Sequence, residues 1–137
     1  MRKDFAVGVR VMIIDGRKLL LGKMSCLGYG REGMWGLFGG HLEQGETFEQ
    51  SAIREIKEEL NIDLECPEVF CVQNDMHASA HWISIGLVAH KWKGEIVNSE
   101  QNNCAELAWF DLDSLPENIY PPNIKIIEKF KKGQFYM

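Results

Sequence analysis

The chain has 137 residues, of which 45% are hydrophobic and 26% charged, and its net charge is −5 with histidine neutral. This balance can bury a core in one compact domain, which we expect to span residues 1–137. The negative charge argues against a surface that coats nucleic acid, but a small phosphorylated substrate stays open because a bound metal ion can reverse the local charge.

The four cysteines are Cys26, Cys66, Cys71 and Cys104, and no two of them form a C-x-x-C pair. Zinc binding therefore has little support, and free thiols in a reducing compartment are expected. The chain has no apolar run long enough to cross a bilayer and no pattern of a signal peptide. We therefore expect a cytoplasmic protein without a membrane partner.

The first elements are predicted to be two strands joined by a tight turn. Residues 5–14 are rich in β-branched side chains, and residues 18–23 read as the returning strand. Asp15-Gly16 between them is a strong turn signal, so the pair is predicted to form a hairpin. Residues 25–33 contain three glycines and are expected to form either a lid or a plain connector.

A short apolar strand at residues 34–38 is predicted to lead into Gly39-Gly40. Two successive glycines allow positive φ and a close approach of the backbone to a ligand. A simple tight turn would explain the same two residues. The sequence leaves both interpretations open.

A helix is predicted to follow, with signals at both of its ends. Thr47 is a suitable N-cap, and Gln50 three residues later completes a capping box. The helix is expected to run to about Leu60, because Asn61 tolerates the left-handed backbone that often ends a helix.

This helix carries Glu55, Glu58 and Glu59 close together on its surface. Like charges repel at this spacing, and Glu59 also falls inside the border of the apolar arc, where a carboxylate is costly unless it is paired or bound to metal. Carboxylate oxygens are the ligands that Mg²⁺ prefers. A solvated charged face is the ordinary alternative, but the neighbouring glycines and the place of Glu59 favour a metal-binding helix.

The rest of the chain is predicted to alternate strands with loops. A strand is expected within residues 62–75, with Pro67 marking a break or an edge. Residues 80–92 alternate strongly and predict another strand, and residues 106–110 predict a shorter one after a polar loop. Residues 123–132 are predicted to form a C-terminal amphipathic helix.

The stretch from Gly39 to Ile62 resembles the Nudix box, G-x5-E-x7-R-E-U-x-E-E-x-G-U, where U is a bulky aliphatic residue. The matching positions are Gly40, Glu46, Arg54, Glu55, Ile56, Glu58, Glu59 and Ile62. Asn61 stands where the motif has glycine, and asparagine also tolerates a left-handed backbone. Phe38 stands where many members have proline before the double glycine.

The resemblance implies an α/β protein with the Nudix fold, an α/β/α sandwich with a mixed central sheet. The segments GGHLEQGE, HWISI and NSEQNNCAELAWFDLDSLP are most similar to the branch of small, MutT-like nucleoside triphosphate diphosphatases. The late loop of that branch commonly reads E-P-x-K-C. Here Glu100 and Cys104 remain at its ends, while the proline and lysine are replaced.

The resemblance also implies roles for individual residues. It implies a Mg²⁺ site, or Mn²⁺ in its place, formed by Glu55, Glu58, Glu59, the Gly40 carbonyl and, as a candidate, Glu100. It implies a catalytic set of Glu55, Glu58, Arg54 and Glu46. Glu55 or Glu58 would act as the general base, with Glu100 as a further candidate, and Arg54 with Glu46 would form an ion pair between loop and helix. Glu100 is equally explained as a solvated loop residue.

Four residues are candidates for binding the substrate. Gly39 would let the backbone approach it, and His41 would contact a phosphate or make a structural hydrogen bond. Trp82 would stack on a base or pack in the core. Arg31 would meet a phosphate or stay solvated on the surface.

The leading hypothesis is a Mg²⁺-dependent pyrophosphohydrolase that cleaves a nucleoside triphosphate, such as an oxidised one, to a monophosphate and pyrophosphate. A second is hydrolysis of a nucleoside diphosphate sugar such as ADP-ribose, and a third is an inactive module that senses a nucleotide. The intact run of three glutamates argues against the third. A homodimer is expected from the resemblance alone, and the partner is a small nucleotide in each case.

Overall fold

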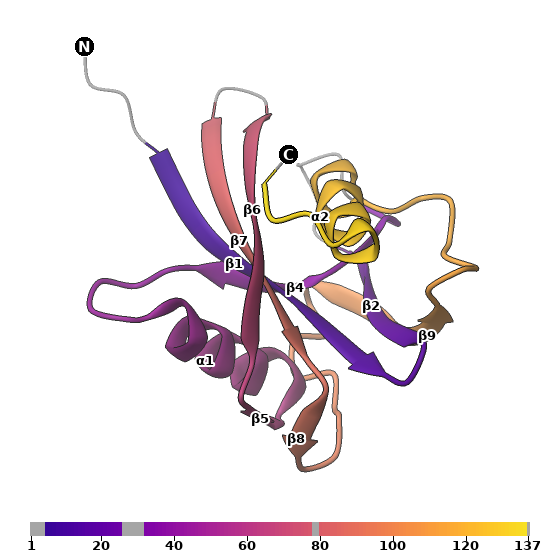
Figure 1. Ribbon diagram of the computed structural model, residues 1–137. Coiled ribbons are helices and arrows are strands. Elements are labelled where there is room, and N and C mark those ends of the chain that lie inside the picture. The colour runs from indigo at the N-terminus through magenta and orange to yellow at the C-terminus, as the bar shows by residue number, and fades with distance from the viewer. Residues whose placement is uncertain (1–4, 26–31, 78–79, 137) are drawn as a thin grey trace.

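The computed structural model describes residues 5–25, 32–77 and 80–136 (Figure 1). These residues form two helices and nine strands. The first helix follows four strands, and the second follows the remaining five. Their bounds are β1 (Phe5–Asp15), β2 (Lys18–Met24), β3 (Trp35–Gly36), β4 (Phe38–His41), α1 (Phe48–Leu60), β5 (Asp63–Glu65), β6 (Glu68–His77), β7 (Ala80–Ala89), β8 (Lys91–Lys93), β9 (Cys104–Asp111) and α2 (Pro121–Lys132).

Strand β1 is the centre of the large sheet. It pairs in parallel with β7 and antiparallel with both β2 and β4, and β6 lies beyond β7. On the other side, β2 pairs with β3 and β9, which makes a mixed sheet of seven strands. The predicted hairpin between β1 and β2 is confirmed, since Ile14 lies opposite Leu19 and Gly16 has a φ of 63°.

The alternation of side chains along β1 gives the sheet two apolar faces, because successive residues of a strand point to opposite sides. Val9, Val11 and Ile13 belong to the core cluster under α1. Met12 and Ile14 belong to the cluster under α2. The two helices therefore cover opposite faces of the sheet (Figure 1), and the predicted α/β/α sandwich with a mixed sheet is confirmed.

The predicted strand at residues 34–38 is divided in the structure. The amide of Leu37 donates to Asn123 Oδ1 at 2.9 Å instead of to a neighbouring strand, so β3 ends at Gly36 and β4 begins at Phe38. The two glycines lie inside β4, where Gly39 is opposite Arg10. They therefore belong to a strand and not to a tight turn.

Smaller differences concern the later elements. Helix α2 begins at Pro121 and not at residue 123, because a proline is well accommodated in the first turn of a helix. The segment 62–75 forms two strands, β5 and β6, that are separated at Pro67. The predicted strand 80–92 ends at Ala89 and is followed by β8. Most of the predicted loop 25–33 lies outside the described residues.

Candidate active site

Helix α1 holds the acidic side chains in place because both of its ends are capped as predicted. Thr47 Oγ1 accepts the amide of Gln50 at 3.1 Å, and the Gln50 side chain accepts the amide of Thr47 at 2.9 Å. Asn61 has a φ of 58°, in the left-handed region. Ala52, Ile56 and other apolar residues bury one side of the helix against the sheet. The glutamates lie beside that buried side.

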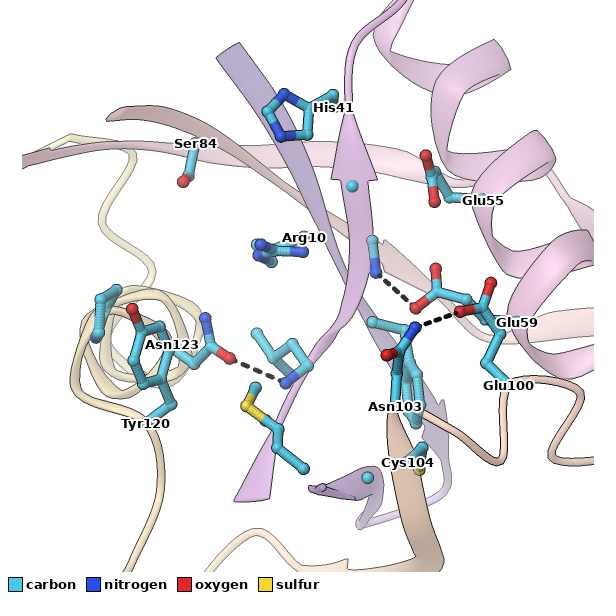
Figure 2. Close-up of a pocket in the computed structure, with 18 of the residues that line it drawn as sticks. Arg10, His41, Glu55, Glu59, Ser84, Glu100, Asn103, Cys104, Tyr120 and Asn123 are labelled. Atoms are coloured by element: carbon cyan, nitrogen blue, oxygen red, sulfur yellow. Dashed lines mark hydrogen bonds between the residues drawn. The ribbon is translucent and has the colours of Figure 1, made fainter. Parts of the chain in front are cut away.

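A cavity of about 850 Å³ opens between α1, the sheet and the start of α2. Glu55 and Glu59 border it from α1, and Glu100 borders it from the loop before β9. Figure 2 shows Glu55 and Glu59 projecting from α1 toward β4, with Asn123 of α2 on the opposite side. The cavity thus has an acidic wall and, facing it, a wall formed by α2.

Glu59 is held in the acidic wall with one oxygen unsatisfied. Its Oε1 accepts the amide of Gly39 at 3.4 Å, while its Oε2 is buried without a hydrogen-bond partner among the described residues. Burial, and next the charge of Glu55, raise the pKa of Glu59 to about 8. An uncompensated buried carboxylate is costly, so this environment suits a residue that binds a cation.

Gly40 is required where it stands because the Glu55 side chain lies directly against it. A Cβ built on Gly40 would lie 2.5 Å from the carboxylate of Glu55, which is closer than atoms can approach. The neighbouring Gly39 has a φ of 147°, and its Cβ would lie 2.0 Å from the carbonyl oxygen of Val9. The double glycine thus lets β4 pass between β1 and the acidic side chains.

Arg54 connects the loop before α1 to the acidic side chains. Its Nε and Nη2 donate to the two carboxylate oxygens of Glu46 at 2.7 and 3.0 Å, and Nη2 also donates to the His41 carbonyl at 3.1 Å. Its Nη1 reaches Glu55 at 3.0 Å and Glu58 at 3.4 Å. This guanidinium lowers the pKa of Glu46 to about 2, and the same contacts raise the pKa of Arg54.

Glu58 differs from the other two glutamates of the helix in its exposure. Its side chain is half exposed and contacts Arg54, and it is not among the described residues that line the cavity. No three acidic, cysteine or histidine side chains of the described residues are close enough together to hold an ion in this conformation. Arg54 Nη1 donates to both Glu55 and Glu58, so this one guanidinium compensates only part of their negative charge.

The remaining predicted residues are divided between the cavity and elsewhere. Gly39, His41 and Trp82 line it, and the rings of His41 and Trp82 lie 4.9 Å apart. Glu100 lines it with its Oε2 accepting from Asn103 at 3.0 Å. Arg31 lies outside the described residues.

Sequence reasoning missed several polar residues that line the cavity from the sheet and from the start of α2. Among them are Arg10, Asp75, Ser84, Tyr120 and Asn123. Arg10 carried a usable signal, because a charged residue interrupts an otherwise apolar strand there. The others are polar residues in strands or at a helix start, and nothing in their spacing connects them with the glutamates.

Comparison with known proteins identifies the family. A model of the NUDIX domain matches residues 4–130. The chain belongs to the Nudix family. A crystal structure of a MutT NUDIX hydrolase from Burkholderia pseudomallei is 32% identical to this Nudix chain and has a TM-score of 0.85, covering 92% of this chain and 98% of the other.

Two curated Nudix relatives differ in their named substrates. An ADP-ribose pyrophosphatase of Methanocaldococcus jannaschii is 32% identical over 93% of this chain and 73% of its own length. An oxidized purine nucleoside triphosphate hydrolase of Danio rerio is 29% identical over 77% of this chain and 66% of its own length. The chain spans only 36% of an NAD-capped RNA hydrolase that it also matches.

Membership of the family makes this protein a hydrolase of phosphoanhydride bonds in nucleotides. Nudix hydrolases generally use divalent metal ions, and the donor chemistry of the acidic wall suits such an ion, although the carboxylates of the described residues are not gathered into a complete ligand set in this conformation. The unsatisfied Glu59 Oε2, the Glu55 carboxylate packed on Gly40 and the nearby Glu100 are all oxygen donors. Among the described residues, no helix is both long and apolar enough to span a membrane.

Proposed function

We propose that the protein is a Mg²⁺-dependent pyrophosphohydrolase that cleaves a nucleoside triphosphate to a monophosphate and pyrophosphate. The observation that carries this proposal is the buried, unsatisfied carboxylate of Glu59 on the acidic wall of the cavity. The wall offers hard oxygen ligands of the kind that Mg²⁺ binds. The Danio rerio relative supports a triphosphate substrate and makes oxidised purine nucleotides the first to test.

The chemistry requires negative charge to be neutralised before water can attack a phosphate. A Mg²⁺ ion held at the acidic wall would supply that neutralisation and polarise the water. Glu55 and Glu59 would hold the ion, with Glu100 and the Gly40 carbonyl as further ligands. Water would then add to the α-phosphorus, the bond from this phosphorus to the oxygen that bridges to the β-phosphate would break, and pyrophosphate would leave. The proton of the water passes to the carboxylate of Glu55 or Glu58.

Arg54 and Glu46 would act by position in this scheme. Their two-bond ion pair and the contact of Arg54 with the His41 carbonyl hold the loop after β4 against α1. The same guanidinium touches both candidate bases. A shift of Arg54 would therefore move Glu55 and Glu58 relative to the phosphate.

Hydrolysis of ADP-ribose or another nucleoside diphosphate sugar is the second candidate. The Methanocaldococcus jannaschii relative favours it, because its identity of 32% extends over 93% of this chain. The bond that is broken is the same kind of phosphoanhydride. The two candidate substrates differ in the group attached to the second phosphate, which is a third phosphate in a triphosphate and a sugar in a nucleoside diphosphate sugar.

A panel of nucleotides incubated with Mg²⁺ tests both candidates directly. Triphosphates, oxidised purine triphosphates, ADP-ribose and nucleotide sugars are each supplied, and the products are separated by chromatography. Monophosphate together with pyrophosphate from a triphosphate supports the proposal. Cleavage that is confined to ADP-ribose or nucleotide sugars contradicts it and favours the second candidate.

The role of the glutamates is tested by Glu58→Gln, which we expect to abolish turnover and leave the fold intact. The matched control is Glu49→Gln, since Glu49 lies in the first turn of the same helix and is exposed. Thermal unfolding and turnover are measured for both variants. Normal hydrolysis by Glu58→Gln would show that the assignment of this residue is wrong.

A further inference from the structure

The sheet face under α2 changes from apolar to polar along its strands. At one end it carries Met12 and Ile14, which pack beneath α2. Toward the cavity the same face carries Arg10, Ser84 and other polar side chains. Figure 2 shows Arg10 between the acidic wall and Asn123, and Ser84 on the sheet above Asn123 in this view.

Four of the buried polar residues lie on this polar part or face it. They are Gln73, Asp75, Ser84 and Asn123, whose exposed fractions are 6%, 5%, 8% and 2%. Gln73 lies directly opposite Ser84 across β6 and β7, and Asp75 lies two residues further along the same side of β6. Burying polar groups is costly unless they form hydrogen bonds. The hydrogen bonds of these four side chains therefore indicate the role of this surface.

Asp75 is held firmly by one of its two oxygens. Oδ1 accepts from Gln73 Nε2 at 3.2 Å and lies 3.6 Å from the Lys125 ammonium. Gln73 is fixed in turn, because its side-chain oxygen Oε1 accepts a hydrogen bond from Lys129 Nζ. These contacts orient the Asp75 carboxylate from the α2 side.

The other oxygen of Asp75 has no hydrogen-bond partner among the described residues, although it is buried. Asp75 borders the same cavity as Glu55 and Glu59. It reaches the cavity from β6, whereas the glutamates reach it from α1. Asp75 Oδ2 is therefore an oriented hydrogen-bond acceptor without a donor among the described residues. A ligand bound in the cavity can supply that donor.

We propose that Asp75 accepts a hydrogen bond from an exocyclic amino group of the nucleobase and makes the enzyme prefer amino-bearing bases. This inference rests on the proposed function, because it needs a nucleotide in the cavity. With the phosphates at the acidic wall, where bound metal ions would compensate their charge, the base would extend into the part of the cavity that Asp75 borders. An anionic carboxylate would repel a phosphate placed there.

The chemistry of the free oxygen distinguishes amino groups from carbonyl groups. A carboxylate accepts hydrogen bonds and donates none. A base carbonyl at this position would bring two acceptors together. The ring N–H of uracil is flanked by two carbonyl oxygens, so a carboxylate that approached it would meet the same repulsion.

Pairs of triphosphates in which one base carries an exocyclic amino group that the other lacks test the proposal. They are CTP against UTP, ATP against ITP and GTP against ITP, and kcat/KM is measured for each. We expect the wild-type protein to favour the amino-bearing member of at least one pair by about tenfold or more, the usual effect of a hydrogen bond to a charged group. Absence of a preference in every pair overturns the proposal.

Asp75→Asn should reduce that ratio toward one, because the amide can turn to present a donor as well as an acceptor. The matched control is Asp63→Asn, which removes an exposed carboxylate of β5. This carboxylate lies 3.5 Å from the Lys57 ammonium and away from the cavity. Should Asp75→Asn fail to fold, Asp75→Glu keeps the charge and displaces the carboxylate, which should also lower the ratio. An unchanged ratio in a folded variant overturns the proposal.

Two further measurements complete the test. One distinguishes a contact of Asp75 with the base from a contact with the sugar, and the other distinguishes failure of this inference from failure of the proposed function. A change in the ratio of CTP to dCTP in Asp75→Asn, without a change in the amino ratios, would place a ribose hydroxyl at Asp75 and overturn the inference. If no triphosphate is hydrolysed, the proposed function fails. The amino ratios are then taken from dissociation constants measured by calorimetry, so the preference of Asp75 is tested without turnover.

Discussion

Glu59 should make the metal-free protein less stable as the pH rises. Its folded pKa of about 8 lies above its ordinary value of 4.5, because burial and the charge of Glu55 favour the protonated form. The folded state therefore binds this proton more tightly than the unfolded state. The contribution to stability is complete below pH 4.5 and is lost as the pH rises through about 8.

The two pKa values set the size of the effect. The linkage relation gives a cost from Glu59 of about 1 kcal/mol at pH 5 and about 5 kcal/mol at pH 9. The free energy of unfolding should thus fall by about 4 kcal/mol more in the wild type than in Glu59→Gln over this range. The variant lacks the titrating group, so it isolates this contribution from all other charges.

Urea unfolding at pH 5, 7 and 9 in the presence of a chelator measures the difference. Glu58→Gln is the control, because that side chain is half exposed, and its effect should stay within about 1 kcal/mol. Adding Mg²⁺ at pH 9 should restore stability to the wild type and not to Glu59→Gln. Parallel pH profiles of wild type and Glu59→Gln would show that Glu59 does not titrate in this way.

Three other substitutions test the construction of the site. Arg54→Lys loses the two-bond pair with Glu46 and should lower kcat/KM by about a hundredfold. Its thermal unfolding should stay near that of the wild type, and unchanged steady-state kinetics would contradict the positioning role. Gly40→Ala should displace the Glu55 carboxylate and lower kcat/KM by at least about tenfold, a result that wild-type activity would exclude. Thr47→Ala should cost about 1 kcal/mol in urea unfolding through loss of the helix cap, with kcat unchanged.

Much of the local structure could be predicted because its causes are local. The turn at Gly16, the capping box at Thr47 and the left-handed Asn61 depend on a few neighbouring residues, and all three are confirmed. The resemblance to the Nudix box implied that Arg54 and Glu46 form an ion pair, and the structure shows two hydrogen bonds between them. Interactions of this kind are encoded by residues close in the sequence or by a motif of fixed spacing.

The break between β3 and β4 could not be predicted because its cause is distant. Leu37 donates to Asn123, which lies 86 positions away along the chain and at the start of α2. No local property of residues 34–38 reveals that partner. The place of the two glycines inside β4 follows from the same long-range packing.

Spacing along the chain was enough to establish the family, the acidic helix and the capping of that helix. The helical projection already places Glu59 at the border of the apolar face. Long-range packing was needed to show that its Oε2 is buried without a partner among the described residues and that Glu58 lies against Arg54 outside the cavity. The same packing brought Asp75 of β6 to the cavity. The physical reason is that burial and charge compensation depend on which elements pack together, and that packing joins residues far apart in the chain.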